Sequence, residues 1–200
     1  MDENAWPEIS AAIAGAPYPV DVLPAEPARA AACLTALGGL TTRSWLGAVV
    51  ASSGGILVDH GWVRVLGSGH DGLPEVIAQP DGVVVAHDVL GGRFAWVQPA
   101  PQARPTVHYF GPDALSWLDL DQGYTAWLSA VLSGGLTGFY ASLRWPGWPA
   151  EVAELDLGQG ISAMPPPFTR EGRDLSAVSR RPIPMAQLID LYDDLATQLG

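Results

Sequence analysis

The chain lacks lysine, cysteine pairs and long apolar runs. Its single cysteine, Cys33, excludes an intrachain disulfide and a metal site built from four thiolates. The longest apolar runs, such as Val83–Ala86, are far shorter than the roughly 18 residues that a membrane-spanning helix needs. The opening segment MDENAWPEIS is acidic, unlike the basic start of a signal peptide. We therefore expect a cytoplasmic protein with no membrane partner.

Positive charge is also scarce. Ten basic residues, all arginine, stand against 21 acidic residues, and the formal net charge is −11. An excess of negative charge repels the phosphates of nucleic acids, so we expect no nucleic-acid partner. The plain interpretation is that the acidic surface keeps the protein soluble. A partner protein, if there is one, is expected to be basic.

The few positive charges are not evenly spread. Four of the ten arginines and only two acidic residues lie between residues 168 and 184. This basic island could bind a phosphate or an acidic peptide. The plainer expectation is that the island balances the charge of acidic residues nearby in the sequence, such as Asp190, Asp193 and Asp194.

The patterns predict a single α+β domain over residues 1–200. Residues 1–40 form an N-terminal helical segment, because Trp6, Ile9 and Ile13 recur at helical spacing and Pro27 suits the first turn of a second helix. The three-proline segment between them predicts an extended connector. Residues 41–132 form the sheet core and its first packing helix, and residues 133–200 form a C-terminal helical extension.

The core is predicted to be a mainly antiparallel sheet of six strands flanked by helices. Its short runs are joined by glycine turns, including His60-Gly61 and Gly91-Gly92, and connections this short suit antiparallel pairing. We expect Gly61 to have a positive φ. The predicted strands cover about residues 45–51, 55–59, 62–67, 83–87, 92–98 and 106–110.

Helical spacing returns after Pro112. Residues 123–133 place an aromatic stripe on one helix face, and a short helix is expected after Gly135 and another at about 149–156. The MPPPF segment predicts a loop, and residues 184–199 predict a final amphipathic helix.

No cofactor is predicted. Gly67, Gly69 and Gly72 have the G-x-G-x-x-G spacing of dinucleotide-binding loops. Only LPEVIAQPDG separates Gly72 from the next strand, and this is too short for the crossover helix that such a site needs.

No catalytic residue and no metal site are assigned either. The serines near glycines do not form a nucleophile elbow. The histidines are dispersed over turns and separate strands, whereas a metal needs converging ligands. If the protein is an enzyme, the candidate site is His87, Asp88 and His108, with the two histidines expected to meet on neighbouring strands.

Two aromatic clusters are candidates for partner binding. Trp145 and Trp148 lie between prolines in RWPGWP, which suits an interface or, as the favoured alternative, a hydrophobic plug over the sheet. Trp117 is the centre of the second cluster, with acidic neighbours that could form a rim around an aromatic anchor. These neighbours are Asp113, Asp119 and Asp121.

Ordered segments along nearly the whole chain resemble a bacterial domain-of-unknown-function family (DUF twenty-six twenty-five). They include VDVLPAEPARA, TTRSWLGA, GGILVDHGWVRVLGSG, VHYFGPDALSW, GYTAWL, FYASLRWPGW and RRPIPM. The name of this family carries no activity.

The pattern over residues 45–132 is similar, more distantly, to the SUKH superfamily. The shared features are a glycine-closed strand, a G-S-G-like turn, a Gly-Gly-x-Phe segment, a V-x-Y-F strand and an aromatic helix. This resemblance implies an α+β fold with a mainly antiparallel sheet and no shared catalytic residues. Bacterial members act largely as immunity proteins that bind and neutralise toxins.

The leading hypothesis is therefore a non-enzymatic protein-binding module. Its acidic face would meet a basic partner, as an immunity protein meets a basic toxin. The alternatives are an enzyme with a site on the sheet and a housekeeping interaction protein.

Overall fold

The computed structural model describes residues 4–98 and 100–199. An eight-stranded sheet has the order β1-β2-β3-β5-β6-β7-β8, and β4 pairs with β5 off this path. All of these pairs are antiparallel. The strands are β1 (Val20–Pro24), β2 (Ser53–Val58), β3 (Val63–Leu66), β4 (Ile77–Gln79), β5 (Gly82–Asp88), β6 (Arg93–Val97), β7 (Thr106–Gly111) and β8 (Ser116–Asp119).

A second sheet has two antiparallel strands, and helices surround both sheets. The strands of the second sheet are β9 (Gln159–Met164) and β10 (Ser179–Pro184). The helices are α1 (Trp6–Ala14), α2 (Pro27–Ala36), α3 (Trp45–Ser52), α4 (Tyr124–Ala130), the π-helical turn η1 (Val131–Gly135), α5 (Leu136–Phe139), α6 (Trp148–Ala153) and α7 (Met185–Leu199). No helix within residues 4–98 and 100–199 is both long and apolar enough to span a membrane.

The predicted α+β class with a mainly antiparallel sheet is confirmed, but the sheet has more strands than the six expected. Strand β1 lies in the segment predicted as a connector, and β8 follows the last predicted strand. Strands β9 and β10 occupy part of the predicted helical extension. Prolines such as Pro182 and Pro184 are tolerated in β10 because it is an edge strand.

The strand predicted over residues 45–51 is wrong, because this segment is helix α3. The Ser44 hydroxyl caps the helix by accepting a hydrogen bond from the Gly47 N–H at 3.0 Å. Leu46, Val49 and Val50 are all buried. A short helix that is apolar on every side has no helical periodicity, so its pattern resembles that of a buried strand.

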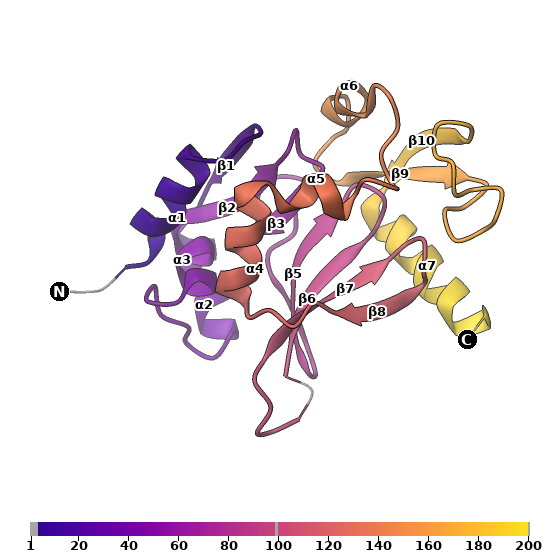
Figure 1. The fold of residues 1–200 in the computed structure, drawn as a ribbon. Coiled ribbons are helices and arrows are strands. Elements are labelled where there is room, and N and C mark those ends of the chain that lie inside the picture. The colour runs from indigo at the N-terminus through magenta and orange to yellow at the C-terminus, as the bar shows by residue number, and fades with distance from the viewer. Residues whose placement is uncertain (1–3, 99, 200) are drawn as a thin grey trace.

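Helices α4 and α7 pack on opposite faces of the sheet. Phe94 on β6 contacts Trp127 of α4, with ring centroids 5.2 Å apart. Its neighbour Arg93 points the other way and forms an ion pair with Asp193 of α7. Figure 1 shows α1, α2 and α3 gathered at one end of the sheet, with α7 at the other end beside β9 and β10.

The turn between β2 and β3 has four residues, 59–62, rather than the two expected. Asp59, His60 and Gly61 all have positive φ, at 54°, 58° and 80°. The positive φ predicted for Gly61 is therefore confirmed. A Cβ added at Gly61 would meet nothing within 4 Å, so only backbone strain would oppose a side chain there.

We predict that Gly61→Ala lowers the free energy of unfolding by about 1 kcal/mol, because alanine is strained at positive φ. The matched control is Gly138→Ala in α5, where φ is not positive and an added Cβ is also free of contacts. The control is expected to leave stability unchanged or to raise it. Urea unfolding midpoints measure both, and equal midpoints would contradict the prediction.

Candidate functional site

Three polar side chains form a row across the face of the sheet that α7 covers. Arg64 on β3 lies opposite His87 on β5, and His87 lies opposite Arg93 on β6. All three are buried, with exposed fractions of 3%, 3% and 7%. Basic side chains are rarely buried unless they are paired, so the groups that contact each of these three side chains determine how its burial is tolerated.

The Arg64 guanidinium is held by backbone oxygens rather than by a carboxylate. Its Nη1 donates hydrogen bonds to the carbonyl oxygens of Leu157 and Gln159, each at 2.6 Å. Its buried Nε has no hydrogen-bond partner within residues 4–98 and 100–199. Burial lowers the pKa of Arg64 to about 10, and among the described residues no acidic side chain opposes this effect. The positive charge of Arg64 is therefore uncompensated.

Arg93, in contrast, has a carboxylate partner, although its Nε is also buried without a hydrogen-bond partner among the described residues. Its guanidinium forms a two-pronged ion pair with Asp193 of α7, with Nη1 at 2.9 Å from Oδ2. It also lies over the rings of Phe110, at 4.5 Å from the centroid, and Trp117, at 5.5 Å. Arg93 thus attaches α7 to the sheet and supports the ring of Trp117.

His87 lies between the two arginines. Its Nε2 is buried without a hydrogen-bond partner in the part of the chain that the structure describes. Burial, followed by the charges of Arg93 and Arg64, lowers the pKa of His87 to about 4. The imidazole is therefore neutral at physiological pH.

A cavity of about 490 Å³ opens beside Arg64 and His87. Apart from these two side chains it is mostly apolar. Its apolar walls come from the loop after β3, the start of β4, the turn before β9 and the first turns of α7, and include Leu73, Pro74, Ile77, Leu157, Met185 and Ile189. Sequence reasoning did not select Arg64. Only the register between β3 and β5 would have placed it beside His87.

The structure does not bring the candidate enzyme residues together. His87 faces α7, and Asp88 follows it on the same strand and points to the other face. His108 lies on β7, so the whole of β6 separates it from β5. Its Nε2 is 3.2 Å from the Thr106 hydroxyl and 3.7 Å from Asp119.

Asp88 is wholly buried and accepts four hydrogen bonds. Oδ1 accepts the backbone N–H groups of Leu90 and Gly92, at 2.9 and 2.8 Å. Oδ2 accepts the hydroxyls of Tyr109 and Tyr140, at 2.8 and 2.9 Å. Burial raises the pKa of Asp88, and these hydrogen bonds oppose the rise. The exposed fraction of Asp88 is 0%, so its carboxylate does not face solvent.

The predicted partner-binding residues around Trp117 lie at an edge of the sheet. Strand β8 is the last in the strand order, and its side chains are exposed. Trp117 and Leu118 have exposed fractions of 44% and 59%. Asp113 lies in the turn before β8, Asp119 ends the strand and Asp121 follows it. All three residues are exposed, and they lie in the edge strand β8 or in the segments that flank it.

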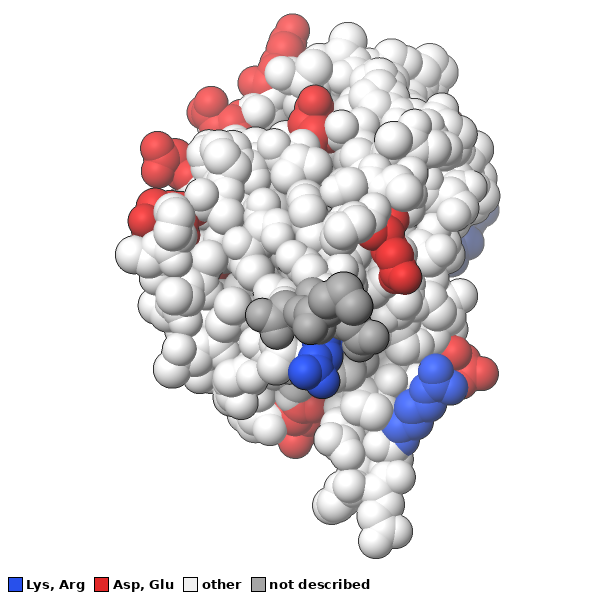
Figure 2. Space-filling view, turned by 90° about the vertical axis from the view of Figure 1, so that its left-hand side faces the viewer, with Lys and Arg blue, Asp and Glu red and all other residues white. Residues whose placement is uncertain are grey.

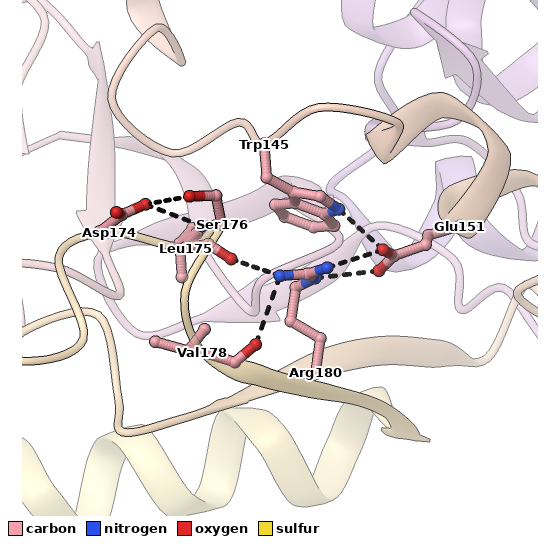
Figure 3. Close-up of polar contacts among 7 residues, drawn as sticks. All are labelled: Trp145, Glu151, Asp174, Leu175, Ser176, Val178 and Arg180. Carbon is pink, nitrogen blue, oxygen red and sulfur yellow. Dashed lines mark hydrogen bonds and ion pairs between the residues drawn. The ribbon is translucent and has the colours of Figure 1, made fainter.

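The other two residues predicted to bind a partner, Trp145 and Trp148, pack against the interior of the protein. Trp145 is buried, and its indole N–H donates to Glu151 at 3.0 Å while the Arg180 guanidinium lies 4.6 Å from its ring (Figure 3). Trp148 packs edge-on against the buried Trp62, with ring centroids 5.0 Å apart. These contacts match the plug interpretation of RWPGWP.

Charge on the rest of the surface is dispersed. Figure 2 shows the face around α1 and α2, where most of the surface is uncharged and acidic side chains are scattered, several of them toward one margin. In the basic island, Arg180 pairs with Glu151 at 2.8 Å rather than with the acidic residues of α7. No group of three or more His, Cys, Asp or Glu side chains within residues 4–98 and 100–199 could hold a metal ion.

Residues 1–188 match the family described as "Protein of unknown function DUF2625". The chain belongs to this family. A similar DUF2625 relative is the Escherichia coli K12 protein YbfG, which is 34% identical over 175 residues, covering 82% of this chain and 80% of that protein. A Haemophilus influenzae protein is 34% identical over 134 residues, covering 60% and 59% of the two chains. Both relatives bear names that call them uncharacterized.

No solved structure matches the chain. The resemblance to the DUF2625 family is thus confirmed, and the SUKH resemblance stays a prediction.

We predict that His87 makes stability depend on pH. Its folded-state pKa of about 4 lies below the ordinary 6.5, so the unfolded chain binds the proton first as the pH falls. The contribution of neutral His87 to the free energy of unfolding is complete above about pH 6.5 and is lost as the pH falls toward 4. The loss is roughly 3 kcal/mol at most. Urea unfolding of wild type and His87→Gln across this range isolates it.

His60→Asn is the control for this pH series, because it removes a histidine from an exposed turn and keeps His87. It is expected to retain the wild-type pH dependence. If His87→Gln also retains it, the prediction is wrong.

We further predict that Asp88→Asn lowers the free energy of unfolding by about 3 kcal/mol, since the substitution leaves buried donors without a charged acceptor. The control is Asp21→Asn, an exposed carboxylate on the edge strand β1, for which less than about 0.5 kcal/mol is expected. Denaturant titrations compare the two. A similar small effect in both variants would refute a structural role for Asp88.

Proposed function

We propose that this protein is a non-enzymatic binding module that takes a basic partner protein along the edge strand β8. The observation that carries the proposal is the pair of large apolar side chains, Trp117 and Leu118, exposed on this edge. A sheet edge also presents backbone N–H and C=O groups that can pair with an extended segment. Trp117 and Leu118 point to opposite faces of the strand, so such a segment would meet both.

The charge around the edge supports a basic partner. Asp113, Asp119 and Asp121 are exposed on both sides of Trp117 in the sequence. The pKa of Asp119 is lowered, chiefly by the hydrogen bond from the Asp121 backbone N–H at 2.9 Å, so this carboxylate stays ionised. Negative charge around an aromatic anchor speeds the encounter with a basic protein, and the ring supplies lasting affinity.

Trp117 is already ordered before any partner arrives. Its ring lies against Phe110, with centroids 5.5 Å apart, and against the guanidinium of Arg93. Arg93 is in turn fixed by Asp193. A side chain that is held in place loses less entropy on binding, which favours affinity.

The predicted SUKH resemblance supplies a class of partner, namely a basic toxin that an immunity protein neutralises. The antiparallel sheet and the burial of Asp88 support a binding role over a catalytic one. The separation of His87 from His108 supports it too. Under this proposal the protein acts by occupying its partner and not by transforming a substrate.

We predict that neutralising Asp119 and Asp121 together, by Asp119→Asn and Asp121→Asn, slows association with the partner far more than it speeds dissociation. The partner is the protein captured from the native host by wild type and lost with Trp117→Ala, which removes the exposed aromatic anchor. Surface plasmon resonance across a salt series gives both rates. Association should slow markedly from low to physiological ionic strength.

Asp190→Asn with Asp194→Asn is the matched control, because it removes the same charge from exposed positions on α7. It is expected to change the association rate much less than the β8 pair does. An acidic partner, or an association rate indifferent to salt and to the β8 substitutions, would overturn the proposed mechanism.

A further inference from the structure

The cavity beside Arg64 combines features that the binding edge does not use. It lies between β3, β5 and the first turns of α7, away from β8 in the strand order. Its volume of about 490 Å³ is within the range of small-molecule sites, roughly 300–1,000 Å³. Small-molecule sites are mostly apolar and have few polar groups, and this cavity has the same composition.

The polar part of the cavity is positive in a protein that is otherwise strongly acidic. The buried guanidinium of Arg64 has no carboxylate within salt-bridge distance in the part of the chain that the structure describes. The other buried or half-buried arginines, Arg93, Arg144 and Arg180, each have one. A buried charge without a counter-charge is costly, and an anion would relieve that cost.

The surroundings of Arg64 define which anion suits the site. One guanidinium with a neutral imidazole beside it balances a single negative charge. A phosphate dianion would need more donors than these two side chains offer. The remaining wall is formed by apolar side chains such as Leu73, Met185 and Ile189, which favour a hydrocarbon chain over a polar body.

We propose that this cavity binds a small carboxylate with an aliphatic chain, such as a medium-chain fatty acid. The carboxylate lies against Arg64 and His87, and the chain lies under the first turns of α7. The bound ligand supplies the counter-charge that Arg64 lacks. This site is independent of the proposed binding edge at β8.

Isothermal titration of the full chain with straight-chain carboxylates from acetate to decanoate tests the proposal. Affinity is expected to rise about threefold to fourfold for each added methylene until the cavity is full. Octanoate should bind at least about tenfold more tightly than 1-octanol, because only the carboxylate forms charge-assisted hydrogen bonds with Arg64. Octanoate should also shift the imidazole NMR signals of His87 and leave those of His60 unchanged.

Two variants of different design test whether octanoate binds in this cavity. Arg64→Met removes the charge, and Ala186→Trp fills the cavity from α7 without altering Arg64. Each is expected to weaken octanoate binding at least about tenfold. Arg43→Met is the control, since it removes an exposed arginine outside the cavity, and it should bind octanoate as wild type does. If Arg64→Met does not fold, octanoate binding by Ala186→Trp and the His87 signals still show whether the ligand occupies this cavity.

Several results would overturn the proposal. One is the absence of binding at every chain length. Another is 1-octanol binding as tightly as octanoate, which would remove the role of the guanidinium. Tighter binding of octyl phosphate than of octanoate would replace the carboxylate with a phosphate ligand. Wild-type affinity in either folded cavity variant would place the ligand elsewhere.

Discussion

The buried carboxylate of Asp88 is the constraint on which much of the fold depends. It connects the turn after β5, strand β7 through Tyr109 and the end of α5 through Tyr140. A buried charge of this kind is tolerated only when its oxygens are fully hydrogen-bonded. It therefore fixes the relative positions of three separate parts of the chain rather than simply adding stability.

Gly92 shows how tightly this arrangement is built. A Cβ at Gly92 would lie 2.0 Å from Oδ2 of Asp88 and 2.6 Å from the Tyr109 hydroxyl. No side chain can be accommodated there unless the carboxylate moves. The Gly91-Gly92 turn, predicted from the sequence as a hairpin signal, is thus also required by the hydrogen bonds that it encloses.

Local patterns predicted the elements that have a clear period or a clear stop signal. Helices α1, α2, α4 and α7 have amphipathic spacing or a proline at the first turn, and strands β2, β3, β5, β6 and β7 are bounded by glycine or proline turns. The three-residue strand β4 was not predicted. Helix α3 was mistaken for a strand because its burial on all sides removes any period. Strand β8 is short and exposed, so no alternation of apolar and polar residues marks it.

The two candidate sites differ in how far the sequence could predict them. Trp117 and its acidic neighbours are close in sequence, so they could be selected before the structure was known. Arg64 and Leu157 are 93 residues apart and meet only through packing. The alternation of faces along a strand separates His87 from Asp88, although the two are adjacent in sequence. The sequence pattern grouped these two residues with His108 as a candidate enzyme site, but it could not assign them to opposite faces.

The absence of lysine limits where proteases can cleave the chain. Every bond that trypsin can cut follows an arginine, and a protease that requires lysine has no site in this chain. Arg64 and Arg93 are buried within strands, and Arg144 is held by Asp59 at 2.6 Å. Cleavage after these three residues requires the fold to open first. Tryptic fragments thus distinguish surface nicking at positions such as Arg43 from opening of the sheet itself.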